Sequence, residues 1–111
     1  MTRQQVADIL ETIGLPISYR FFPIGNAPEN PPYLLFFYEG NDDMMADDQN
    51  YVDIKNLVVE LYTEGEREWA TETAVDNVPK SNNLVYSKEE EYLTETNMYR
   101  TTYEMEVIIN G

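Results

Sequence analysis

The sequence predicts an α+β fold, a two-layer sandwich with two helices on one face of a mixed or mostly antiparallel sheet of about five strands. Two segments, 51–63 and 99–109, carry the sheet prediction because their apolar residues recur at every second position, the period of a strand with one buried face. Two helical stripes, near 2–13 and 66–78, supply the second layer. The predicted inward residues of the two strands are Leu57, Val59, Leu61, Tyr103, Met105, Val107 and Ile109.

Length and composition indicate one domain over residues 1–111. A chain of 111 residues is long enough to bury a single core. Hydrophobic residues make up 42% of the chain and nine residues are tyrosine, which separates it from disordered sequences in spite of a net charge of −14. The longest fully apolar run, 33–38, is far shorter than a membrane span.

The residue types that are missing exclude most catalytic and metal sites. The sequence has no cysteine and no histidine, so it lacks thiolate ligands and the usual general base near neutral pH. Its seven basic residues are scattered singly among 21 acidic ones, which offers no patch for DNA phosphates or an anionic membrane. We therefore expect no enzyme activity, no cofactor, no metal, no membrane binding and no sequence-specific binding to nucleic acid.

The first helix is predicted from its capping pattern. Thr2 and Gln5 have the spacing of a capping box, in which each side chain bonds the other residue's backbone amide. The apolar stripe then runs to Ile13, and Gly14 followed by Pro16 ends the helix.

Two strands, 17–22 and 33–38, follow the first helix. The loop between them, 23–32, contains four prolines, which cannot donate hydrogen bonds into a sheet. The segment 33–38 is apolar on both faces, which predicts either a central strand or a strand whose second face another molecule covers.

An acidic segment, 39–50, is expected to form a solvated loop at a hairpin tip. It holds five acidic residues, but no register in it matches the order of ligands in an EF-hand. Met44 and Met45 in this loop offer a soft apolar contact to a partner.

The second helix is expected over 66–78, with Pro79 as its stop. Its small apolar side chains form one stripe, and Trp69 lies near the opposite side. An outward Trp69 suggests either a contact between subunits or packing of the helix end against a loop. The acidic run 88–91 then predicts a bulged hairpin between 84–93 and the final strand.

Strand length predicts self-association. Strands of about 12 residues are about 40 Å long, whereas helices of about 12 residues are about 18 Å long, so the helices leave part of the sheet uncovered. Side chains on the outward register would then contact a neighbouring subunit. The predicted contact residues of a homo-oligomer are Met44, Met45, Val58, Tyr62, Trp69 and Ile108.

Several short segments follow one another in an order that covers nearly the whole chain. They are Ile13-Gly-Leu-Pro16, Pro32-Tyr-Leu-Leu-Phe-Phe-Tyr38, Ala46-Asp-Asp48 before Tyr51, Val59-Glu-Leu-Tyr-Thr63 and Tyr103-Glu-Met-Glu-Val107. In this order the chain resembles the small tail-completion (tail terminator) and head–tail neck proteins of long-tailed bacteriophages and prophages. The acidic stretch 89–91 is longer than in that pattern.

The resemblance implies a structural protein of phage morphogenesis that forms or joins a ring at the tail or neck, completes the tail and connects it to the head. It implies further copies of the chain and tail-tube or neck proteins as partners, in the bacterial cytoplasm during assembly and then in the virion. Acidic subunits suit such a ring, because carboxylates repel the phosphates of passing DNA. The alternative is an acidic interaction module or DNA-mimic inhibitor of a basic partner, and the assembly state distinguishes the two.

Overall fold

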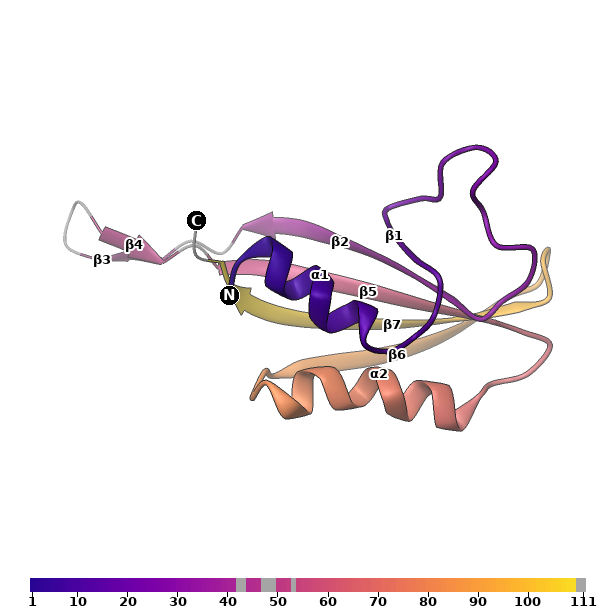
Figure 1. The fold of residues 1–111 in the computed structure, drawn as a ribbon. Helices are drawn as coiled ribbons and strands as arrows, with labels where there is room; N and C mark the ends of the chain where they lie inside the picture. Colours follow the sequence, from indigo (N-terminus) through magenta and orange to yellow (C-terminus); the bar gives the residue numbers. More distant parts are fainter. Residues whose placement is uncertain (42–43, 47–49, 53, 110–111) are drawn as a thin grey trace.

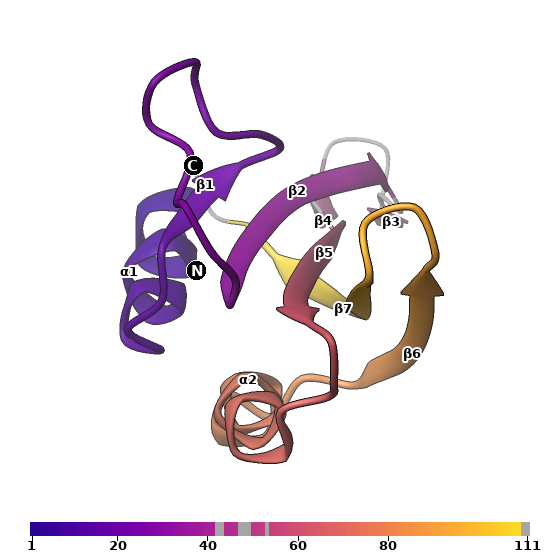
Figure 2. The ribbon, with the colours of Figure 1, turned by 90° about the vertical axis from the view of Figure 1, so that its right-hand side faces the viewer.

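The computed structural model describes residues 1–41, 44–46, 50–52 and 54–109. One helix, α1 (Arg3–Glu11), precedes the sheet in the chain, and the other, α2 (Trp69–Ser81), lies between its strands. The five-stranded sheet has the order β1-β2-β5-β7-β6, in which β1 is parallel to β2 and the other neighbours are antiparallel. Both helices cover the same face of the sheet (Figures 1 and 2). This arrangement confirms the predicted two-layer α+β sandwich. Its strands are β1 (Ile17–Tyr19), β2 (Tyr33–Asn41), β5 (Ile54–Glu64), β6 (Tyr86–Leu93) and β7 (Met98–Ile108).

A second, two-stranded sheet extends beyond one end of the sandwich. Its strands, β3 (Met44–Ala46) and β4 (Asn50–Val52), lie between β2 and β5 in the chain and project past the helices (Figure 1). The molecule is 51 Å long but only 28 and 25 Å across. Its radius of gyration of 15.2 Å exceeds the value of about 13 Å for a compact chain of this length. The segment 39–50, expected as a solvated loop at a hairpin tip, holds more strand than predicted, because β2 continues to Asn41 and β3 pairs with β4. Residues 42–43 and 47–49 lie outside the described part of the structure.

The core lies between the helices and the inner face of the sheet. Val6 and Leu10 of α1 and Val75 of α2 pack onto the strands and are at most 2% exposed. All the inward residues predicted for the segments 51–63 and 99–109 are buried, as the alternation of their apolar side chains requires. They are Leu57, Val59, Leu61, Tyr103, Met105, Val107 and Ile109.

The start of α1 has the predicted capping box. The Thr2 hydroxyl accepts a hydrogen bond from the Gln5 amide at 3.1 Å, and the Gln5 side chain accepts one from the Thr2 amide at 2.8 Å. The helix ends at Glu11, two residues before the predicted Ile13, and Gly14 follows with a φ of +86°.

The second helix differs from its prediction at both ends. It begins at Trp69 rather than at residue 66, and it passes through Pro79 to Ser81. A proline in the last turn removes only one helical hydrogen bond, and the Asn82 side chain donates to the Val78 carbonyl at 2.8 Å just beyond it.

Strands β1 and β6 also differ from what the sequence predicts. Strand β1 ends at Tyr19, three residues early, because Arg20 has a φ of +65°. Strand β6 runs from Tyr86 to Leu93 in unbroken register with β7, so the predicted bulge at the acidic run is wrong. The physical reason is that the inward members of this run find ion-pair partners outside their own strand.

Candidate interaction surfaces

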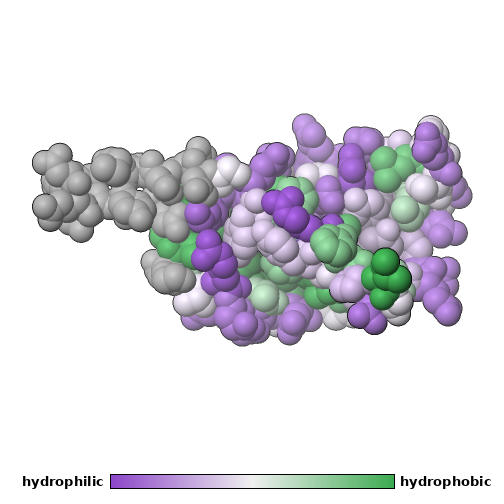
Figure 3. Space-filling view, turned by 90° about the horizontal axis from the view of Figure 1, so that it is seen from above, coloured by the Kyte–Doolittle hydropathy of each residue, from purple (hydrophilic) through white to green (hydrophobic). Residues whose placement is uncertain are grey.

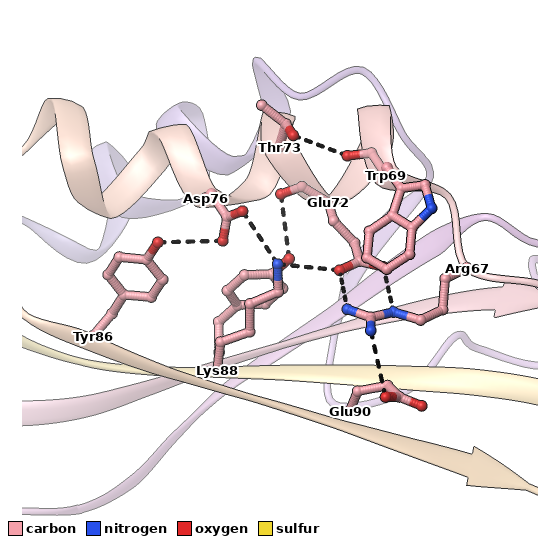
Figure 4. Close-up of polar contacts among 9 residues, drawn as sticks. Arg67, Trp69, Glu72, Thr73, Asp76, Tyr86, Lys88 and Glu90 are labelled. Atoms are coloured by element: carbon pink, nitrogen blue, oxygen red, sulfur yellow. Dashed lines mark hydrogen bonds and ion pairs between the residues drawn. The ribbon is translucent and has the colours of Figure 1, made fainter.

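A cluster of charged side chains lies between α2 and β6 (Figure 4). Glu72 is only 2% exposed, and its carboxylate accepts hydrogen bonds from Arg67 at 2.7 and 3.0 Å. The Lys88 ammonium group lies 3.1 Å from Glu72 and 3.2 Å from Asp76. The Tyr103 hydroxyl donates to the Glu72 carbonyl at 3.2 Å.

The ion pairs decide the charge state of this cluster. Burial alone raises the pKa of Glu72, but hydrogen bonds from Arg67 and Lys88 outweigh burial and bring its pKa below the ordinary value. Burial likewise acts to lower the pKa of Lys88, and its bonds to Glu72 and Asp76 raise that pKa above the ordinary value. Each charge is therefore held in its ionised form, which suits a structural clamp between α2 and β6 rather than proton transfer.

Trp69 begins α2 and is exposed, as the helical periodicity predicts. The residue is 65% exposed, and the Arg67 guanidinium lies 4.3 Å from the centroid of its ring (Figure 4). Because Arg67 also binds Glu72, the indole is supported on one side and open on the other. Trp69 therefore presents a large, ordered apolar surface to solvent.

The outer face of the sheet is more closed than predicted. Val58 lies on the outward register but is only 2% exposed, so it offers no contact surface. Tyr62 is partly buried, and its ring stacks on Tyr33 at 5.0 Å. Burial, followed by the charge of Glu60, raises the pKa of Tyr62 to about 12.

The other three predicted contact residues lie toward the end of the molecule that carries β3 and β4. Ile108, at the end of β7, is 53% exposed, as predicted. Met44 and Met45 have backbone in β3, and their side chains lie outside the described part of the structure.

One surface that the sequence interpretation missed lies around the β1 edge of the sheet. We call it the arginine surface and define it by Tyr19, Arg20, Phe21 and Ile24. The last two are 67% and 104% exposed, and hydrophobic side chains are visible toward this end of the molecule in Figure 3. The Arg20 guanidinium lies 5.0 Å from the centre of the Phe37 ring. The apolar run 21–24 around Pro23 could have indicated this surface in the sequence, because it adjoins a loop that cannot bury it.

A second missed surface lies where β6 begins and β7 ends. We call it the acidic surface and define it by Val85, Glu104, Glu106 and Ile108. Val85 is 87% exposed, and both glutamates are exposed on the outward register of β7. Two open hollows of about 420 and 390 Å³ adjoin one another here, and Val85 and Glu106 line both.

The described residues show no arrangement for metal binding. Within 1–41, 44–46, 50–52 and 54–109, no group of three or more potential ligand side chains could hold a metal ion. The acidic loop considered in the sequence lies mostly outside these residues. Of the helices in the described part of the chain, none is long and apolar enough to cross a membrane.

The fold and these surfaces define a small acidic α+β sandwich with exposed apolar positions at both ends. No protein-family model matches the sequence, and no curated protein matches it. Among solved structures, a chain from the virion of a native gene transfer agent (GTA) particle is similar, with a TM-score of 0.66 and 15% sequence identity. The match covers 97% of this chain and 90% of that chain, so the two share one fold over nearly their full lengths.

Proposed function

We propose that the protein is a structural component of a phage-type particle. In this proposal it forms or joins a ring at the tail or neck, completes the tail and connects it to the head. The observation that carries the proposal is the fold match to a chain of a GTA virion, which extends over 97% of this chain. The order of sequence segments described above supports the same role.

The shape and charge of the protein suit this role. The long axis of 51 Å and the projecting β3–β4 sheet give each subunit reach beyond its own core. The net charge of −14 would keep DNA from adhering to the inner wall of a ring. The protein acts without catalysis in this proposal, assembles in the bacterial cytoplasm and remains in the virion.

The exposure of the predicted contact residues reduces their number. Trp69 and Ile108 are exposed and apolar, Tyr62 is partly exposed, and Met44 and Met45 lie on the projecting β3 segment. Buried aromatic residues often dominate such interfaces, which makes Trp69 the strongest candidate. Val58 is too buried to take part.

Light scattering across salt and subunit concentration tests the proposal. At low salt, repulsion among subunits of charge −14 should keep the protein monomeric, and screening at higher ionic strength should favour assembly. Trp69→Ala and a Met44→Ala/Met45→Ala double variant should weaken assembly. Tyr92→Ala removes an aromatic residue of 44% exposure outside the proposed contacts and serves as the matched control.

The same variants should be tested in a tail assembly assay. If the wild type stays monomeric under all conditions and both variants still complete tails, these contacts are not the working surface. A monomer that instead binds a basic protein tightly would support the alternative of an acidic interaction module or DNA-mimic inhibitor.

A further inference from the structure

The arginine surface carries positive charge that the described residues do not neutralise. Arg67, Lys88 and Arg100 each form ion pairs with acidic side chains. Arg20 makes no ion pair with any residue in the described part of the chain; its guanidinium donates to the Tyr38 carbonyl at 3.3 Å and lies over the rings of Tyr19 and Phe37. In a chain with only seven basic residues, an arginine without an ion pair among the described residues, beside exposed apolar side chains, forms a distinct surface.

The acidic surface has the opposite charge and a similar apolar part. Glu104 and Glu106 have no ion-pair partner among the described residues, and they flank hollows next to the exposed Val85. The amino group of Met1 lies at the margin, where it donates to the Ile108 carbonyl at 3.0 Å. The hollows therefore suit an apolar side chain accompanied by a guanidinium group.

The two surfaces lie far apart on the molecule. Strand β1 forms one edge of the five-stranded sheet and β6 forms the other. The loop after β1 lies at the end of the sandwich away from β3 and β4, whereas the start of β6 and the end of β7 lie toward them (Figure 1). One surface therefore cannot reach the other within a single subunit.

We propose that the arginine surface of one copy docks on the acidic surface of a second copy. In this contact the apolar side chains at 21 and 24 enter the hollows beside Val85, and Arg20 faces Glu104 and Glu106. This inference rests on the proposed self-association and adds two surfaces to the contacts proposed at Trp69, Met44 and Met45. Because the two surfaces differ, the contact is head-to-tail, which produces a closed ring or an open filament rather than a two-fold dimer.

The contact also reconciles assembly with a charge of −14. Each junction brings Arg20 to Glu104 and Glu106, none of which has an ion pair among the described residues, so the interface is attractive although the subunits repel one another overall. A stable interface buries about 800 Å² on each partner, and two such surfaces take about a quarter of the 7041 Å² accessible surface of one subunit. The subunit is therefore large enough to carry both.

A charge-swap experiment tests this contact. Arg20→Glu makes both surfaces acidic, and Glu104→Arg with Glu106→Arg makes both basic, so each variant alone should associate at least tenfold more weakly than the wild type. When the two variants are mixed, every junction again joins opposite charges, and association should recover. Two control variants leave both surfaces intact. Lys80→Glu has the same net charge as Arg20→Glu, and Glu11→Arg with Glu95→Arg has the same net charge as Glu104→Arg with Glu106→Arg. These controls should not gain association on mixing.

An apolar substitution supplies an independent measurement. Ile24 is fully exposed, so Ile24→Ser should leave the stability of the free subunit unchanged and still weaken association. If the wild type associates but the charge variants and Ile24→Ser associate equally well, the proposed contact is wrong while self-association stands. If the wild type never associates, with or without a tail tube, both the contact and the proposed function fail.

Discussion

Replacing Glu72 by glutamine should destabilise the subunit by about 2 kcal/mol at pH 7. The Glu72 carboxylate is nearly inaccessible and accepts charged hydrogen bonds from Arg67 and Lys88. Removing one partner of a fully buried ion pair costs about 3–5 kcal/mol. The side chains of Arg67 and Lys88 are 26% and 29% exposed, so water recovers part of that loss. For a chain of this length the expected fall in melting temperature is about 8 °C.

The effect of Glu72→Gln should depend on pH. The pKa of Glu72 is lower in the folded state than its ordinary value of 4.5, so the wild type gains stability from this group above that pH. As the pH falls through the folded pKa, the carboxylate takes up a proton and the gain disappears. The difference between wild type and Glu72→Gln should therefore shrink toward pH 3.

Urea unfolding of dilute protein at low salt measures this difference without a contribution from assembly. Glu90→Gln is the matched control, because Glu90 contacts Arg67 at 3.5 Å and its side chain is 35% exposed, which predicts a loss under about 0.5 kcal/mol. The reasoning would be refuted if both variants lost the same stability at pH 7, or if the loss from Glu72→Gln did not change with pH.

Three further predictions concern other parts of the chain. Thr2→Ala removes the side-chain cap of α1 and should lower the free energy of unfolding by about 1 kcal/mol in the same urea assay, with Thr73→Ala as a control. Ultraviolet titration should show a phenol with a pKa of about 12 that disappears in Tyr62→Phe; a titration complete near pH 10 would contradict the burial of Tyr62. Trp69, the single tryptophan, should be quenched readily by iodide in the free subunit and protected on assembly, whereas unchanged quenching would remove it from the interface.

Local periodicity accounts for most of the fold. Alternating apolar residues place β7, most of β5 and their inward side chains correctly, because the direction of a strand side chain depends only on its position along the strand. The start of the predicted strand 51–63 belongs instead to β4. The continuity of β6 could not be predicted in this way. The Lys88 side chain lies on the inward face of β6, between acidic neighbours in the sequence. An inward lysine is stable there only because Glu72 and Asp76 of α2 lie opposite it in the folded structure.

The exposure of the proposed contact residues was predictable only in part. Trp69 and Ile108 are exposed where the helical and strand periods place them. Val58 follows the outward register, but its neighbours across the sheet, Phe37 on β2 and Glu104 on β7, lie directly beside it, and it is almost fully buried. The exposed residues of the loop after β1 were missed because periodicity says nothing about side chains outside helices and strands.

Electron microscopy of particles assembled with and without the protein tests the central claim most directly. The proposed role predicts that the gene product is present in purified particles, and that its loss leaves tails with irregular ends or tails that fail to join heads. Supplying the wild-type protein should restore regular tails joined to heads. Particles of normal length and connection in its absence would contradict a role in completing the tail.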